Sequence, residues 1–215
     1  MDEKKTDEEK IRILNRLVEH YGFQHWWEDK NRISDWISMI LIQQTTEKNA
    51  KQALKNLENY LTVEQLWEMD VELLQQFIRP SGFYTQKSIY IKELMGWFIK
   101  HGSNFDRFSE YSTEQLRKEL LTIKGVGQET ADAMLLYIFE RKVFICDQYA
   151  IRLFNRLGFG NYKNYSEMKK DFGHLTENVS YKLCKEWHAA IDVHGKYFNK
   201  NIEEDWLIDR GEILE

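Results

Sequence analysis

LLTIKGVGQETADAMLLYIFERKVFICDQYAIRLFNRLG, residues 120–158, is the stretch that decides the fold. Its pattern predicts a helix, a tight turn at Gly125-Val126-Gly127, a second helix, a short extended link, and a helix that opens at Asp147. The glycine pair lets the backbone approach a ligand closely, because both residues lack side chains and tolerate positive φ. Amides at the start of the next helix would then favour an anion such as phosphate. An ordinary αα-hairpin remains an open alternative, since short glycine patterns are common.

Asp147 has two candidate roles. An aspartate just before an amphipathic helix is typical of an N-cap. Twenty residues after a phosphate-binding hairpin, the same carboxylate is also placed to face a nucleotide. There it could oppose the cation that develops on deoxyribose as a base departs, and align or deprotonate a water molecule. One carboxylate is enough for that reaction.

The rest of the chain predicts an all-α fold of about ten short helices. Pro80 is the only proline. Thr62 and Ser112 are each followed three residues later by glutamine, in the spacing of a capping box. Glycines stand where helices should end, at Gly22, Gly102 and Gly158. The helical spacing of apolar residues is seen at Ile11, Leu14, Leu17, Val18 and Tyr21, at Ile33, Trp36, Ile37 and Ile40, at Ile91, Leu94, Met95 and Phe98, and at Ala150, Ile151, Phe154 and Leu157.

Composition excludes several protein classes. The 215 residues are 42% hydrophobic and 14% aromatic, which is too apolar for a disordered chain. No run approaches the length of a membrane span, and the charged opening stretch is unlike a signal peptide. Cys146 and Cys184 give neither a disulfide framework nor a cysteine metal cluster, which suits buried thiols in a reducing cytoplasm.

The formal net charge of -5 argues weakly against nucleic acid as a partner, because nucleic-acid binders usually carry a basic excess. A net count does not say where charges lie on the surface. Backbone amides at helix N-termini can also hold phosphates without any lysine. The charge therefore does not exclude DNA.

The hairpin and the acid that follows it resemble the helix-hairpin-helix motif, the Gly/Pro-rich loop and the catalytic aspartate of the endonuclease III superfamily of base-excision DNA glycosylases. Residues 39–54 resemble the family's early helix and the loop after it, and residues 79–84 with Lys87 resemble its second DNA-facing loop. The resemblance implies that Asp147 is the catalytic carboxylate of an enzyme that flips a damaged base out of duplex DNA. The motif residues are Ile123, Gly125, Val126, Gly127, Thr130, Ala131 and Asp147.

Three departures from the family pattern refine this expectation. Members that also nick DNA carry a Schiff-base lysine where this chain has Glu129, and a carboxylate cannot do amine chemistry, so no lyase step is expected. Many members end with four cysteines that ligate an iron-sulfur cluster, whereas residues 194–206 contain none, so no cluster is expected. Lys124 replaces the proline usual in the hairpin and could add a phosphate contact.

Within the superfamily the chain is most similar to the cluster-free, monofunctional 3-methyladenine DNA glycosylases. The likeness is carried by Trp26-Trp27, by residues 79–84 and 127–133, and by a late His194-Gly195-Lys196. An N3-alkylated purine is positively charged, so an indole face can hold it by stacking and cation-π attraction. The substrate-binding residues so implied are Trp26, Trp27, Phe23, His25 and Lys196, with two alternatives open: one tryptophan buried in the core, and Lys196 a solvated helix-end residue.

The resemblance also implies how duplex DNA is held. Gln44 would enter the gap left by the flipped base and Phe83 would wedge into the opposite strand, unless it is a packed loop aromatic. Gln43 is expected to be a solvated helix-end residue. Replacing both hairpin glycines by alanine is expected to weaken binding of all duplexes without loss of folding. The hairpin contacts would come from Lys124, Gly125, Gly127, Gln128 and Thr130.

The expected organisation is two helical lobes that enclose a cleft, one formed by residues 31–141 and the other by residues 1–30 and 142–215. The partner would be double-stranded DNA with a damaged base, and we expect a monomer in the cytoplasm, associated with the nucleoid and not with a membrane. No metal or other cofactor is expected, except that the hairpin carbonyls could hold a monovalent cation.

Two other functions remain open. A mismatch or adenine glycosylase of the same fold would keep Asp147 and the hairpin while acting on a neutral base. A non-catalytic helix-hairpin-helix DNA-binding module would also explain Gly125 and Gly127. Such a module would not need Asp147, a second DNA-facing loop, or paired tryptophans.

Overall fold

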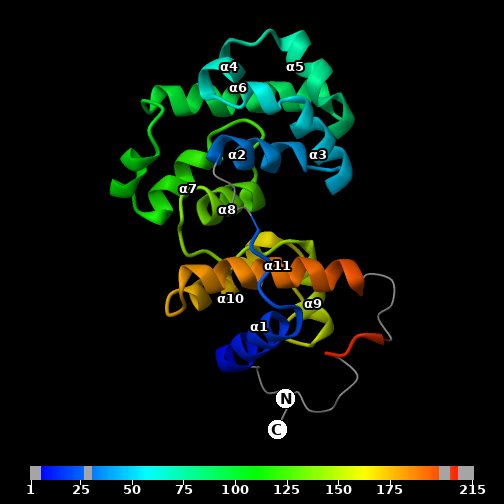
Figure 1. Cartoon of the computed structure of the whole chain (residues 1–215). Coiled ribbons are helices and arrows are strands. Elements are labelled where there is room, and N and C mark those ends of the chain that lie inside the picture. The colour runs from blue at the N-terminus through cyan, green and yellow to red at the C-terminus, as the bar shows by residue number, and fades with distance from the viewer. Residues whose placement is uncertain (1–5, 27–30, 199–203, 208–215) are drawn as a thin grey trace. The chain divides into compact units, whose positions relative to one another are not determined.

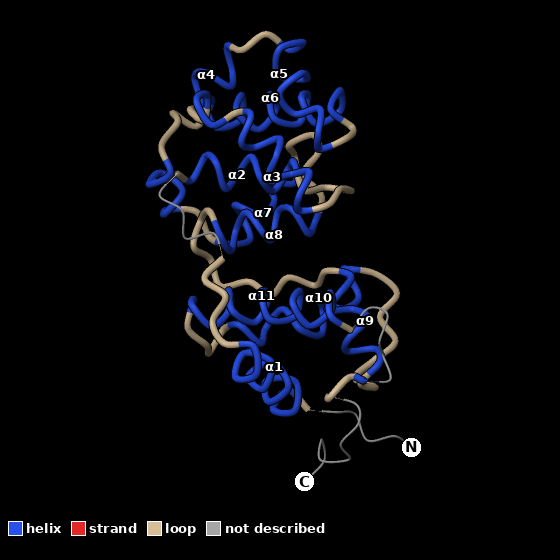
Figure 2. Tube along the Cα trace, turned by 45° about the vertical axis from the view of Figure 1, so that its right-hand side comes forward, coloured by secondary structure: helices blue, strands red, loops and turns tan. Residues whose placement is uncertain are grey.

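A computed structural model describes residues 6–26, 31–198 and 204–207. Within these ranges the secondary structure is helical and contains no strand, which confirms the predicted all-α fold (Figures 1 and 2). No described helix combines the length and the apolar character that crossing a membrane would require. The chain forms two compact units, Met1–Trp26 with Lys142–Glu215 and Trp27–Arg141, and each is described by itself.

The unit that contains both ends of the chain is built around its last long helix. Its elements are α1 (Asp7–Tyr21), α9 (Gln148–Arg156), α10 (Tyr165–Phe172), η4 (Gly173–Thr176) and α11 (Tyr181–Tyr197), with α11 packed against α1 and α9 (Figure 1). The apolar stripe of α1 supplies the fully buried Leu14 and Leu17, which join Phe154 and Trp187 in one core. Because α11 contributes to this core, its position in the unit is fixed, and so are the positions of the side chains that it directs away from the core.

The other unit contains the hairpin and the helices before it. Its elements are α2 (Arg32–Leu41), α3 (Glu47–Asn56), η1 (Glu58–Tyr60), α4 (Val63–Glu68), α5 (Val71–Ile78), η2 (Arg79–Ser81), α6 (Tyr84–Lys100), η3 (Phe105–Glu110), α7 (Thr113–Leu121) and α8 (Gln128–Tyr137). Trp36 of α2 is fully buried, with the rings of Phe98 and Phe139 packed edge-on against it. Figure 2 shows α7 and α8 as a helical pair joined by a short turn, which is the predicted hairpin.

Local signals in the sequence locate several helix ends correctly. Ser112 forms the predicted capping box with Gln115 at the start of α7. Thr62 caps α4 by accepting a hydrogen bond from the Gln65 amide. All three glycines expected to end helices follow a helix in a left-handed conformation, since Gly22, Gly102 and Gly158 have φ of 71°, 81° and 73°. These ends set the lengths of the loops that carry the candidate site residues.

Candidate functional site

The hairpin between α7 and α8 is held closely against α6. Gly125 has φ of 92°, and a Cβ placed on it would lie 2.1 Å from Cγ of Tyr90. Only glycine fits there without movement of the tyrosine ring. Gly127 differs, because it is the N-cap of α8 with φ of -85° and nothing lies within 4 Å of an added Cβ. The N-terminus of α8 is therefore accessible, flanked by the exposed Lys124 and Gln128, and can accept an anion.

Gln43 joins the loop after α2 to this hairpin, which corrects the expectation of a solvated residue. Its Nε2 donates to the Gly125 carbonyl oxygen at 3.1 Å and to Oγ1 of Thr130 at 3.2 Å. Thr130, an expected DNA contact, is half-buried and uses its hydroxyl oxygen in this bond. A monovalent cation at the hairpin stays a prediction, and a carbonyl oxygen that already accepts one hydrogen bond has a second lone pair left for it.

Gln44 and Phe83, the two expected insertion residues, share an unusual backbone. Gln44 lies between α2 and α3 with φ of 52°, and Phe83 begins α6 with φ of 46°. Side-chain-bearing residues rarely adopt this left-handed region, and it marks strain that surrounding structure must hold. Gln44 is exposed and the Phe83 ring is 64% exposed, so the packed-aromatic alternative for Phe83 is wrong.

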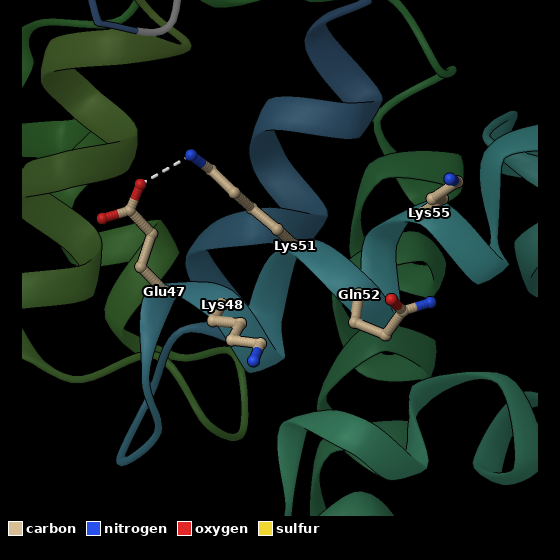
Figure 3. Close-up of a pocket in the computed structure, with 5 residues that line it drawn as sticks. All are labelled: Glu47, Lys48, Lys51, Gln52 and Lys55. Carbon is tan, nitrogen blue, oxygen red and sulfur yellow. Dashed lines mark ion pairs between the residues drawn. The ribbon is translucent and has the colours of Figure 1, made fainter.

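Positive charge is concentrated on α3, directly after the Gln44 loop. Lys48, Lys51 and Lys55 lie on the exposed side of this helix, and with Glu47 and Gln52 they line a shallow hollow (Figure 3). In Figure 3 Lys51 reaches back to Glu47, and the two charged groups form an ion pair of 2.6 Å. The sequence analysis missed this basic face, although lysines at positions i, i+3 and i+7 signal one side of a helix.

Asp147 is the N-cap of α9, which confirms the capping role without excluding chemistry. Its Oδ1 accepts a hydrogen bond of 2.7 Å from the Ala150 amide, while Oδ2 lies 3.8 Å from Nε2 of His188. The residue is only 8% exposed. The pKa of this carboxyl is raised to about 6, mainly by burial and also by the nearby Asp192, while the hydrogen bond from the Ala150 amide lowers it. Most of the carboxylate is still ionised at neutral pH.

Three polar side chains, His188, Asp192 and Lys196, are spaced four residues apart along α11, and the first of them lies beside Asp147. Burial lowers the pKa of His188 to about 4, so this imidazole is neutral at pH 7. Lys196 Nζ forms an ion pair of 2.6 Å with Oδ2 of Asp192. The sequence analysis missed His188 and Asp192, although their helical spacing from Lys196 was a readable signal.

Trp26 brings an aromatic face to the same group. Lys196 Nζ lies 5.4 Å from the centroid of its ring, and the His188 ring stands edge-on to it at a centroid distance of 6.1 Å. Lys196 is thus part of the cluster even though its side chain is 47% exposed. We define the acid cluster as Trp26, Asp147, His188, Asp192 and Lys196, all of which belong to one compact unit.

The other expected substrate-binding residues are placed differently. The buried Glu186 carboxylate accepts hydrogen bonds from the backbone amides of Gln24, at 2.6 Å, and His25, at 3.4 Å. These bonds attach the loop after α1 to α11. Phe23 and His25 are exposed, and the Phe23 ring is covered by Lys182 Nζ at 4.5 Å rather than by a member of the acid cluster. Trp27 lies outside the described residues.

The motif around Lys196 is largely structural. The ring nitrogens of the buried His194 bond to Oδ2 of Asp205 at 3.1 Å and to the Tyr21 hydroxyl at 3.0 Å. Gly195 lets α11 approach α9 closely, since a Cβ there would lie 2.1 Å from Cδ1 of Tyr149. Only the last residue of the motif, Lys196, therefore belongs to the acid cluster. In the described part of the chain, no group of three or more His, Cys, Asp or Glu side chains is arranged to hold a metal ion.

Comparisons with known proteins agree with this combination of hairpin and acid. Residues 37–178 match the HhH-GPD superfamily of base excision DNA repair proteins. A protein of Methanocaldococcus jannaschii that is named a DNA repair glycosylase is 36% identical over 193 residues, which cover 87% of each chain. Endonuclease III of Thermotoga maritima is 31% identical over 149 residues, which cover 68% of this chain and 65% of that protein.

A solved structure shares the arrangement of the helices. The crystal structure of the H. pylori 3-methyladenine DNA glycosylase, bound to 1,N6-ethenoadenine, superposes with a TM-score of 0.74 at 26% identity and covers 86% of this chain and 96% of that one. The family match spans the hairpin and Asp147, and it extends over more than half of the 215 residues. The chain therefore belongs to the HhH-GPD superfamily of base excision DNA repair proteins and is a DNA glycosylase.

Proposed function

We propose that this glycosylase hydrolyses the N-glycosidic bond of an alkylated purine such as 3-methyladenine and performs no lyase step. The observation that carries the proposal is the ring of Trp26, over which Lys196 Nζ lies at 5.4 Å while it pairs with the Asp192 carboxylate at 2.6 Å. An indole face with a carboxylate close by attracts a cation. An N3-alkylated purine is a flat cationic ring, and it could take the place of the Lys196 ammonium over Trp26.

The chemistry then needs little proton donation. As the bond between C1′ and the base nitrogen breaks, its electron pair neutralises the cationic base, and positive charge develops on the sugar. The ionised Asp147 would oppose that charge, and the attacking water would give its hydroxyl to C1′ and its proton to the carboxylate. The neutral His188 cannot serve as a strong acid, which suits a leaving group that already carries its charge.

The absence of a lyase step rests on Glu129. This exposed residue lies in the first turn of α8, at the position where resembling bifunctional enzymes carry an amine. A carboxylate cannot form a Schiff base with C1′ of the abasic sugar. The product would be an intact strand with an abasic site.

DNA binding would use the other compact unit of a monomeric protein. The accessible N-terminus of α8, with Lys124 and Gln128 beside it, would hold a phosphate. After the base leaves the DNA duplex, the exposed Gln44 would fill the gap that it leaves, and the exposed Phe83 would hold the unstacked base step of the opposite strand open.

The test is a panel of duplexes that carry methylated, deaminated, oxidised or mismatched bases, with Asp147→Asn as the inactive control. We expect release of 3-methyladenine, and strand breaks only after alkali. Preferred release of a mismatched adenine or thymine would contradict the proposal and indicate a mismatch or adenine glycosylase of the same fold. Binding without any excision would favour a non-catalytic module.

A further inference from the structure

A lysine is buried in the unit that contains the hairpin, where its ammonium group has no acidic partner among the described residues. Lys87 of α6 is 2% exposed, and Nζ donates to the carbonyl oxygens of Leu41 at 2.7 Å and Ser81 at 2.8 Å. Burial lowers its pKa to about 8. A buried ammonium is costly unless its hydrogen bonds are made, so this position requires both carbonyl acceptors.

The two carbonyls lie at the starts of the two loops that hold the expected insertion residues. Leu41 is the last residue of α2, three residues before Gln44, and Ser81 is the last residue of η2, two residues before Phe83. The two loops are far apart in sequence, but α3, which follows the first loop, packs directly on η2, which precedes Phe83. Gln44 and Phe83, both with positive φ, thus each follow within three residues a carbonyl that accepts from the same ammonium group.

Gln43 extends the connection to a third element. Its side-chain amide bonds to the Gly125 carbonyl and the Thr130 hydroxyl, so the loop that Lys87 anchors at Leu41 is also anchored to the hairpin, two residues later. Two side chains therefore link three segments: residues 42–46, residues 79–84 and the hairpin at residues 122–127.

We propose that Lys87 and Gln43 are positioning residues that fix these three segments as one preassembled surface for duplex DNA. The consequence for DNA rests on the proposed function, while the linkage itself does not. Preassembly would lower the conformational cost of ordering Gln44 and Phe83 at the moment a base is flipped. The two loops would then lose or gain order together, because they share one anchor.

The helix α6 supplies a matched control. Lys92, five residues after Lys87, also bonds through Nζ to two carbonyl oxygens, those of Trp67 at 2.6 Å and Met69. Its carbonyls flank the end of α4 rather than the loops of Gln44 and Phe83. Lys87→Met and Lys92→Met thus remove the same kind of interaction from the same helix at different places.

The experiment compares hydrogen exchange, by mass spectrometry, in the full-length parent, Lys87→Met and Lys92→Met. We expect Lys87→Met to raise exchange in residues 42–46 and 79–84 together, whereas Lys92→Met raises it only near residues 67–70. Gln43→Leu, a milder change at a half-buried position, should raise exchange in residues 42–46 and 122–127 and serves if Lys87→Met does not fold. Parental exchange rates in residues 42–46 and 79–84 of a folded Lys87→Met would overturn the proposal. If only Gln43→Leu folds, parental rates in residues 42–46 and 122–127 of that variant would overturn it.

The same proteins are then titrated with a duplex containing a tetrahydrofuran abasic analogue and with undamaged duplex. Lys87→Met should bind the abasic duplex about tenfold more weakly, with less effect on undamaged DNA, and Lys92→Met should bind both like the parent. Equal affinities for the parent and Lys87→Met would contradict the DNA role. If the parent excises no lesion but the exchange result holds, the proposed function fails and the linkage stands.

Discussion

Gly125 lies against the ring of Tyr90 so closely that a Cβ at this glycine would be 2.1 Å from Cγ of the tyrosine. The same test at Gly127 finds open space. The two hairpin glycines therefore have different roles. Gly125 allows a left-handed backbone and close packing on Tyr90, whereas Gly127 leaves the start of α8 uncovered. The expectation that both can be replaced without loss of folding stays a prediction, and the cost in stability is expected at Gly125 rather than at Gly127.

Separate alanine variants should divide these roles. Gly125→Ala should lower the free energy of unfolding by about 1 to 3 kcal/mol, because of the ring contact and a φ of 92°. Gly127→Ala should unfold like the parent in urea and should bind all duplexes more weakly, since its methyl group stands where a phosphate would approach. A Gly127→Ala protein with parental DNA affinity would show that the hairpin is not the anchor.

Asp147→Asn should reduce excision by on the order of 10²- to 10³-fold, because the variant lacks the charge that opposes the developing cation. Asparagine caps helices about as well as aspartate, so α9 should persist. Single-turnover release of the base measures the rate, and circular dichroism checks the helix. Near-normal excision by this variant would refute the catalytic assignment of Asp147.

The raised pKa of Asp147 predicts that this residue lowers the free energy of unfolding as the pH rises, the opposite of what a carboxyl with a lowered pKa does. The folded protein holds the proton up to about pH 6, whereas the unfolded chain releases it near 3.8, so ionisation destabilises the fold as pH rises between these values. Relative to the parent, Asp147→Asn should gain nothing at pH 4 and on the order of 2 kcal/mol at pH 7. Urea unfolding of both proteins at the two pH values measures this, and a gain at pH 4 that vanishes at pH 7 would contradict it.

Excision by the parent should rise with pH, with a midpoint near pH 6, and level off about one unit higher, as the Asp147 carboxylate loses its proton. His188 should add no step near neutrality, because burial already keeps it uncharged there. Single-turnover rates between pH 5 and pH 8 test both statements. A rate that falls across this range would point to a required acid instead.

Strands treated with the parent enzyme should remain intact until alkali is added, and borohydride should trap no covalent complex. The reason is the carboxylate of Glu129 at the position where a Schiff base would form. Gel separation of end-labelled duplexes measures both outcomes. Trapping by borohydride would overturn the monofunctional proposal even if Asp147 proves essential.

The basic face of α3 should contribute to the salt dependence of binding. Replacing Lys48, Lys51 and Lys55 by glutamine should reduce the slope of log K against log salt concentration by about 1 to 3, because each phosphate contact contributes roughly 0.9. Lys118→Gln, an exposed lysine of α7 paired with Glu114, is the control and should leave the slope unchanged. An unaltered slope in the triple variant would mean that this face does not meet DNA.

The helical fold, the hairpin and the N-cap of Asp147 could all be predicted because they follow from local spacing. The roles of Lys87 and Gln43 could not, since nothing in the sequence tells a buried polar residue from a solvated one. One partner of each lies 46 or 82 residues away along the chain. The spacing of His188 from Lys196 shows that they share a face of one helix, but the low pKa of His188 comes from burial, which no motif reveals. The net charge of -5 likewise conceals the three lysines of α3.

The hydrogen bonds from the backbone amides of Gln24 and His25 to Glu186 attach the loop of Trp26 to α11. This helix supplies His188, Asp192 and Lys196, so most of the acid cluster is encoded by one helix and one short loop. The hairpin and the residues proposed to grip DNA belong to the other compact unit. On the proposed function, substitutions in this helix and loop would change lesion preference and leave the residues proposed to hold DNA as they are.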